Sequence, residues 1–235
     1  MKAIFKKEMK SYFNSPLGYV FIAVFALVTA LFFSLYNLFP GMGDITYIFS
    51  NITLLLVLLI PVLTMRSFAE EKNKKTDQLL LTCPIKVSSI VAGKVLAAFA
   101  VFAMALGVTL VYPLILSLYT DMAWLTIIGT YFGFFCLGAA FISICVFISS
   151  LTENLLISAI SSFGALFVIY LMDWISGTVE NPVISAVVNA LSVTARYADF
   201  SMGVINIPHV VYFISVVAIF GLLTVAQIEK RRWVK

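Results

Sequence analysis

Long runs of apolar residues, separated by short polar segments, dominate the chain. Six of these runs contain no Asp, Glu, Lys, Arg or His. Each is close to or longer than the roughly 20 residues that a helix needs to cross the hydrocarbon core of a membrane. The runs are Leu17–Phe39, Ile45–Met65, Val95–Thr120, Trp124–Ser150, Leu155–Met172 and Val210–Ile228. We therefore expect an all-α integral membrane protein with six transmembrane helices.

Composition supports this prediction. The residues are 62% hydrophobic and only 11% charged, whereas soluble domains are about 25% charged. The net charge of +4 comes from residues that flank the apolar runs, so it does not indicate nucleic-acid binding. The length of 235 residues leaves room for one bundle of spans. Residues 1–235 are therefore predicted to form a single transmembrane domain.

Basic residues gather on one side of the predicted membrane. With six spans both termini lie on the same side, together with the segment between spans two and three. That side carries 14 of the 15 Lys and Arg residues, and only Arg196 lies on the other. Cytoplasmic loops carry an excess of Lys and Arg. We therefore expect a multi-pass protein of the cell membrane with both termini in the cytoplasm.

The first 13 residues have the pattern of an amphipathic helix. At 100° per residue the apolar side chains share one face and four lysines crowd the other. The apolar residues are Met1, Ile4, Phe5, Met9 and Tyr12. Such a helix lies at the membrane surface with its lysines toward anionic headgroups. The alternative is a positively charged flank that only fixes the orientation of the first span.

Met65–Lys94, here the coupling segment, is the only long charged segment inside the chain. Thr76 is a suitable cap for a short helix, which Pro84 would end because proline cannot continue it. Three consecutive leucines beginning at Leu79 would need a surface to bury against. These features predict a cytosolic helix between spans two and three that a partner protein contacts. An ordinary solvated loop is the alternative.

The predicted outer segment between spans five and six is long. It contains one apolar run, Val183–Leu191, which at nine residues is too short to cross the bilayer. We expect it to form a short helix that does not cross the membrane.

The sequence contains no recognisable catalytic constellation. It has no HExxH motif, a single histidine and no GxxxxGK[ST] phosphate-binding loop, so we expect neither enzymatic activity nor a cofactor on this chain. Glu70 and Glu71 faintly resemble the paired glutamates of intramembrane metalloproteases, but the supporting histidines are absent. Gly129 and Gly133 form a GxxxG pattern, which permits close helix packing either within the chain or between subunits.

Several segments, taken in order along the chain, resemble one family of membrane proteins. They are KKEMKSYFNSPLGYV near the N-terminus, RSFAEEK at Arg66–Lys72, TDQLLLTCP at Thr76–Pro84, Gly93-Lys94, and RYADFSMGVI at Arg196–Ile205. The chain resembles the membrane subunit of ABC-2 type ABC transporters, within the gliding-motility-associated permease group. It departs from that group at Lys75, where Gly is common, and at Asn206, where an acidic residue is common.

The resemblance implies a type V exporter-like permease with six spans, an interfacial N-terminal helix, a coupling helix and short outer helices before span six. Two permease subunits, identical or different, would face each other, each seated on a cytosolic ABC ATPase that binds ATP and Mg²⁺. The expected ATPase-coupling residues are Glu70, Glu71, Lys74, Lys75, Thr76, Asp77, Leu79, Leu80, Pro84 and Glu153. Gly129 and Gly133 are the candidates for subunit packing.

The rival interpretation is a membrane scaffold that recruits a cytosolic protein without transporting anything.

Overall fold

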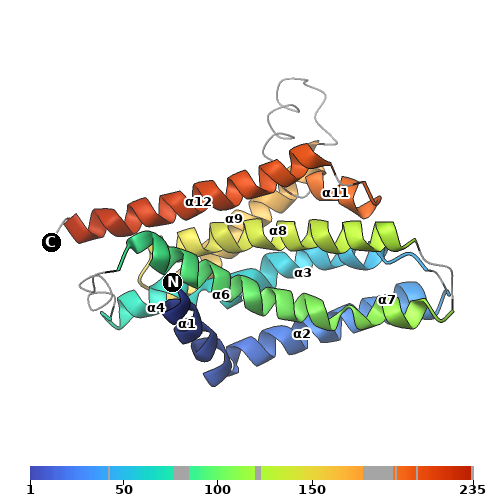
Figure 1. The fold of residues 1–235 in the computed structure, drawn as a ribbon, viewed down its shortest axis with the longest axis horizontal. Helices are drawn as coiled ribbons and strands as arrows, with labels where there is room; N and C mark the ends of the chain where they lie inside the picture. The colour runs from blue at the N-terminus through green and yellow to red at the C-terminus, as the bar shows by residue number, and fades with distance from the viewer. Residues whose placement is uncertain are drawn as a thin grey trace.

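The chain folds into a bundle of helices that lie side by side along one axis (Figure 1). In this computed structural model the described residues are 1–41, 43–76, 85–119, 123–176, 193, 195–204 and 206–233. The regular elements in these ranges are all helical. They are α1 (Lys2–Asn14), α2 (Pro16–Phe33) with a π-helical extension (Ser34–Leu38), α3 (Thr46–Thr64), α4 (Arg66–Asn73), α6 (Val87–Val108), α7 (Val111–Leu116), α8 (Trp124–Leu151), α9 (Leu155–Ser176), α11 (Ala195–Ser201) and α12 (Ile207–Trp233).

Six helical stretches are long and apolar enough to cross a membrane, which confirms the predicted number. They are Pro16–Leu38, Thr46–Asn73, Val87–Leu116, Trp124–Leu151, Leu155–Met172 and Ile207–Lys230. The second stretch continues through α4, and the third begins at Val87, ahead of its predicted start at Val95. Lys94 therefore lies inside the third helical stretch. A polarity criterion stops a span at its first charged residue, whereas helical backbone hydrogen bonding continues through it.

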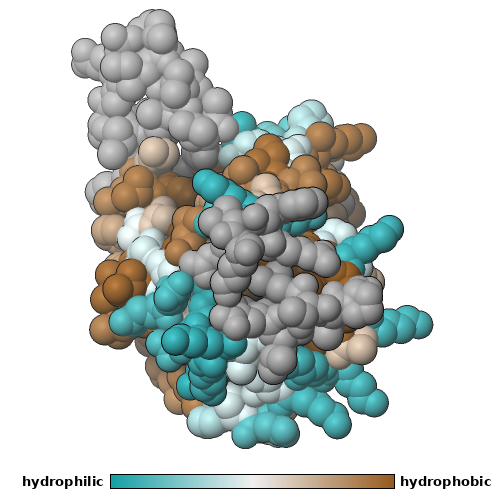
Figure 2. Space-filling model, turned by 90° about the vertical axis from the view of Figure 1, so that its left-hand side faces the viewer, coloured by the Kyte–Doolittle hydropathy of each residue, from teal (hydrophilic) through white to brown (hydrophobic). Residues whose placement is uncertain are grey.

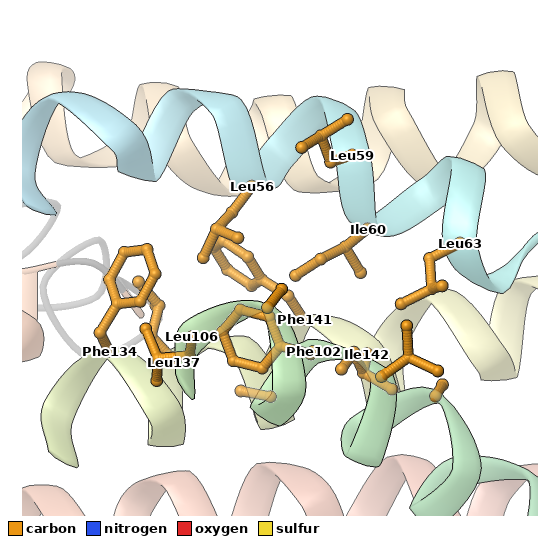
Figure 3. Packing of buried hydrophobic residues seen from close by; sticks show 14 of the residues in the cluster. Leu56, Leu59, Ile60, Leu63, Phe102, Leu106, Phe134, Leu137, Phe141 and Ile142 are labelled. Atoms are coloured by element: carbon orange, nitrogen blue, oxygen red, sulfur yellow. The ribbon is translucent and has the colours of Figure 1, made fainter. Parts of the chain in front are cut away.

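Helices α3 and α8 form the centre of the bundle. In the most apolar part of the membrane-spanning stretches that contain α3 and α8, 61% and 67% of the residues are buried, against 17% in the stretch from α9 and 11% in the stretch from α12. Leu56 and Ile60 from α3 pack against Phe134 and Phe141 from α8, with Phe102 of α6 alongside (Figure 3). These side chains are all fully buried. Tight packing between α3, α6 and α8 therefore positions the other helices.

Helix α7 follows a break in the third span. Pro113 lacks the N–H group that would bond to the carbonyl of Thr109, four residues earlier. That carbonyl accepts a hydrogen bond of 3.0 Å from the backbone N–H of Tyr112 and one of 2.8 Å from the hydroxyl of Tyr131, on α8. The break is thus stabilised by a neighbouring helix, as polar backbone groups in an apolar environment require.

Helix α11 has seven residues and is too short to cross the bilayer. Its Asp199 lies 3.2 Å from the imidazole of His209, in the first turn of α12. The guanidinium of Arg196 lies 3.6 Å from the ring centre of Tyr212. These two contacts fasten α11 to α12. The predicted outer helix at Val183–Leu191 lies outside the described residues.

The GxxxG pattern of α8 faces α11 of the same chain. A Cβ atom at Gly133 would lie 2.4 Å from the Cβ of Phe200, which is fully buried. At Gly129 it would lie 3.2 Å from the Cα of Gly203. Packing within one chain therefore accounts for both glycines, and their role in subunit packing stays a hypothesis.

Replacing Gly133 with Ala is expected to destabilise the fold. The added methyl group would collide with the Cβ atom of Phe200, which can move only if the backbone of α11 moves. Overpacking of this kind costs about 1–3 kcal/mol of unfolding free energy. Equilibrium unfolding in mixed detergent micelles measures the effect. Gly164→Ala is the matched control, since nothing lies within 4 Å of a Cβ built there. Equal stability of the two variants would contradict the proposal that Gly133 makes room for Phe200.

Candidate functional site

Both chain termini lie at one end of the bundle, here the charged end (Figure 1). Helix α1 crosses the bundle axis at this end, and α4 and the first turns of α6 lie beside it (Figure 1). Figure 2 looks onto the charged end, around which hydrophilic side chains project while hydrophobic residues cover the flanks. The polar chemistry of the described residues is therefore concentrated where α1, α4 and α6 meet.

Lys94 of α6 joins these three helices. Its side chain is buried, with the residue only 2% exposed. The ammonium lies 2.9 Å from a carboxylate oxygen of Glu8 on α1 and 3.0 Å from one of Glu71 on α4. It also donates a hydrogen bond of 2.6 Å to the carbonyl of Ser67, on α4. An ammonium group has three N–H donors, so each has an acceptor. A buried charge of this kind is retained only when it is paired.

A second lysine completes the group. The ammonium of Lys7 lies 2.7 Å from Glu71 and 3.8 Å from Glu8. We call Lys7, Glu8, Glu71 and Lys94 the charge cluster. Partial burial opposes the charge of Lys7, but the hydrogen bond and attraction from Glu71, with a smaller contribution from Glu8, outweigh it, so the pKa of Lys7 is raised. Lys7 therefore remains a cation at neutral pH.

Two local features of the sequence build the cluster. Ile4, Glu8 and Tyr12 follow each other at intervals of four residues, so they share one face of α1, and all three are buried. A Cβ at Gly93 would lie 2.9 Å from the side chain of Ile4. The missing side chain at Gly93 thus lets α1 lie directly on α6, one residue before Lys94.

Helix α4 is also attached to the end of α8. The hydroxyl of Ser149 accepts hydrogen bonds from the backbone N–H groups of Phe68 and Ala69, at 3.2 and 3.3 Å, and donates one of 3.1 Å to the carbonyl of Met65. The N–H groups of the first three residues of a helix lack partners within it, so Ser149 caps α4 at Phe68 from another helix. Lys72 donates a hydrogen bond to the carbonyl of Ser150.

The structure brings together several of the residues predicted to couple to an ATPase. Glu71 belongs to the charge cluster, and Glu70 forms an ion pair of 2.7 Å with Lys74. Thr76 closes α4 through a backbone hydrogen bond of 2.9 Å to the carbonyl of Glu71. Glu153 lies in the connection between α8 and α9, just beyond the end of α8 that contacts α4. Asp77, Leu79, Leu80 and Pro84 lie outside the described residues.

Lys75 has a left-handed backbone, with φ of 55°. Residues with a side chain rarely adopt this conformation, whereas glycine adopts it readily. Glycine would therefore adopt the backbone of position 75 more readily than the lysine that this chain carries.

Sequence reasoning missed Lys7, Glu8 and Lys94 as site residues. Helical periodicity carried a signal for one of them, because Glu8 lies between Ile4 and Tyr12 on the same face. The pairing of Lys94 with residues far away in sequence had no local signal.

A cavity of about 300 Å³ opens beside the charge cluster, between α1 and α4. Besides the cluster its lining includes Arg66, Lys74 and the hydroxyl residues Ser11, Ser15 and Thr76. This polar cavity gives solvent a route toward the cluster. Within the described residues no group of His, Cys, Asp and Glu is arranged to hold a metal ion. The charge cluster and its cavity lie at the junction of α1, α4 and α6.

Replacing Lys94 with Met is expected to lower the unfolding free energy by about 3–5 kcal/mol, because the buried carboxylate of Glu8 and the partly buried one of Glu71 then lose a shared cation. Adding Glu8→Gln should recover part of this loss, since it removes one of those carboxylates. Unfolding of the single and double variants in detergent micelles measures the coupling. Lys74→Met is the exposed control and should change stability by no more than about 0.5 kcal/mol. Strict additivity of the Lys94 and Glu8 changes would contradict the cluster.

Comparison with known proteins supplies the identity of the fold. The model of the ABC-2 family of transporter proteins matches residues 2–188, which is well over half of the chain and includes the coupling segment. No curated protein matches the chain at a significant level. With its six candidate spans, the chain belongs to the ABC-2 family of transporters, as a membrane permease component.

Proposed function

We propose that this chain is the permease subunit of an ATP-driven exporter and that the charged end faces the cytoplasm, where a separate ABC ATPase binds. The distribution of basic residues supports this orientation. In the six-span topology, 14 of the 15 Lys and Arg residues belong to segments on the side of the membrane that both termini share, and cytoplasmic segments carry an excess of such residues. Permeases of this family generally work with ABC ATPases. ATP and Mg²⁺ would be bound by that partner.

The burial of Lys94 between Glu8 and Glu71 is the observation on which the proposed mechanism rests. The segment between α4 and α6 begins just after Glu71 and ends shortly before Lys94, so its two ends are tied together at the cluster. A displacement of α4 must either carry α1 and α6 with it or break buried ion pairs. The cluster therefore favours movement of the three helices as one unit.

Two further connections extend this unit into the spans. Only Met65 separates α4 from α3, which is part of the buried centre. Ser149 and Ser150 hold α4 to the end of α8, the other central helix. A push from the ATPase on the coupling segment would thus reach α3, α6 and α8 directly.

The docking surface is proposed to be Lys74–Pro84, with Leu79 and Leu80 as apolar anchors in a groove of the ATPase. Glu70, Lys75 and Thr76 would contribute polar contacts beside them, and Glu153 a second contact. A coupling helix at this position and an interfacial role for α1 follow from the same proposal. It also includes a second permease subunit across a shared translocation path, and a place in the gliding-motility-associated group.

Replacing Leu79 and Leu80 with Asp is expected to abolish stable binding of the ATPase, because two charges would then enter an apolar groove. Co-purification from membranes measures binding, and membrane insertion of the variant should be unchanged. If the wild-type chain stimulates ATP hydrolysis by the ATPase and the variant does not, the result supports the transporter interpretation over the scaffold interpretation. Undiminished complex formation by the variant would exclude this docking site.

Ser149→Ala is expected to weaken the transmission of motion without preventing assembly, since the N–H group of Phe68 in α4 then loses its acceptor. Such groups are worth about 1–3 kcal/mol when left unsatisfied and buried. A fluorophore at Leu118→Cys, in a chain whose three native cysteines are replaced by Ser, reports the ATP-driven change at the opposite end of the bundle.

The signal should fall in Ser149→Ala and persist in Ser161→Ala, the control. The hydroxyl of Ser161 is exposed and bonds only to carbonyls of its own helix. A full signal in Ser149→Ala would show that the α4–α8 contact transmits nothing.

A further inference from the structure

The lysines of α1 divide into two groups with different surroundings. Lys7 is held in the charge cluster, as described above. Lys2, Lys6 and Lys10 are exposed and follow each other at intervals of four residues, so they form one row along the helix. Within the ranges that the structure describes, none of these three takes part in an ion pair. The row is therefore available to an external anionic partner.

The opposite face of α1 is fixed to the protein. Ile4, Glu8 and Tyr12 are buried, and Phe5 and Met9 pack partly against the core. A turn of 100° per residue separates the row of lysines from the buried row by about half the circumference. The same rigid helix thus presents cations on one side and a cluster carboxylate on the other.

The position of α1 selects the kind of partner. The helix crosses the bundle axis at the charged end (Figure 1), so its length lies roughly in the plane of the membrane surface. A row of lysines in that plane matches the anionic headgroups of a bilayer leaflet. Each lysine near such a surface strengthens association by about fivefold. An acidic surface of the ATPase is the competing partner, and the experiment below separates the two.

We propose that anionic lipid regulates the coupling of ATP hydrolysis through α1. Lipid bound to Lys2, Lys6 and Lys10 holds α1 at the surface, and Glu8 passes this constraint to Lys94 and so to α4. This inference rests on the proposed function, because the regulated activity is that of the attached ATPase. It adds a lipid input to the junction that receives the push of the ATPase.

The test uses the full permease–ATPase complex in phosphatidylcholine vesicles that contain increasing fractions of phosphatidylglycerol. ATP hydrolysis by the wild-type complex is expected to rise with the anionic fraction, and high salt should weaken the response. The variant K2Q/K6Q/K10Q should lose the dependence on phosphatidylglycerol while still binding the ATPase. Glu8→Gln should keep the lysine row but show a reduced response, because the link to Lys94 is weakened.

The matched control removes the three cationic charges of Lys230, Arg231 and Arg232 near the C-terminus and should retain the dependence. An equal loss in this control would overturn the proposal, since any basic charge would then serve. Weaker ATPase co-purification with K2Q/K6Q/K10Q would also overturn it, because the lysines would then contact the ATPase. A wild-type complex that hydrolyses ATP equally in all vesicles defeats this inference alone. Absence of any ATPase association with the wild-type chain defeats the proposed function itself.

Discussion

The arrangement of the charged end depends on one buried cation shared by two carboxylates. Lys94 is surrounded by protein, and its attraction to Glu8 and Glu71 acts in a medium of lower dielectric constant than water. Loss of either partner leaves a desolvated charge behind, which is far more unfavourable than loss of a surface pair. The cluster therefore fixes how α1, α4 and α6 sit against each other.

The same end combines three kinds of attachment that differ in their chemistry. The ion pairs of Lys94 are charged and buried, the cap from Ser149 uses neutral hydrogen bonds, and Gly93 permits direct contact between backbone and side chain. Together they connect α4 to helices at the centre and at the surface of the bundle. This arrangement fits the family to which the chain belongs, in which membrane and ATPase components work together.

Apolar length and charge distribution were sufficient to predict six spans, because hydrophobic thickness is a constraint that each segment meets by itself. The burial of Lys94 was not predictable in this way, since it depends on carboxylates 86 and 23 residues away in the chain. The lysine at position 75 was visible as a departure from the family, but its left-handed backbone was not. Glu8 was readable in part from its spacing.

The low burial of α9 and α12 has a consequence for how such a molecule can change shape. Most of their apolar side chains face outward. In a membrane, lipid tails are as apolar as these side chains, so contact with lipid replaces contact with another helix at little cost in free energy. A small shift of the outward faces of these helices replaces one apolar contact with another, while their inner faces stay packed against α8. The protein thus combines a charged end that is held by buried ion pairs with outer helices whose exposed apolar faces can exchange their lipid neighbours.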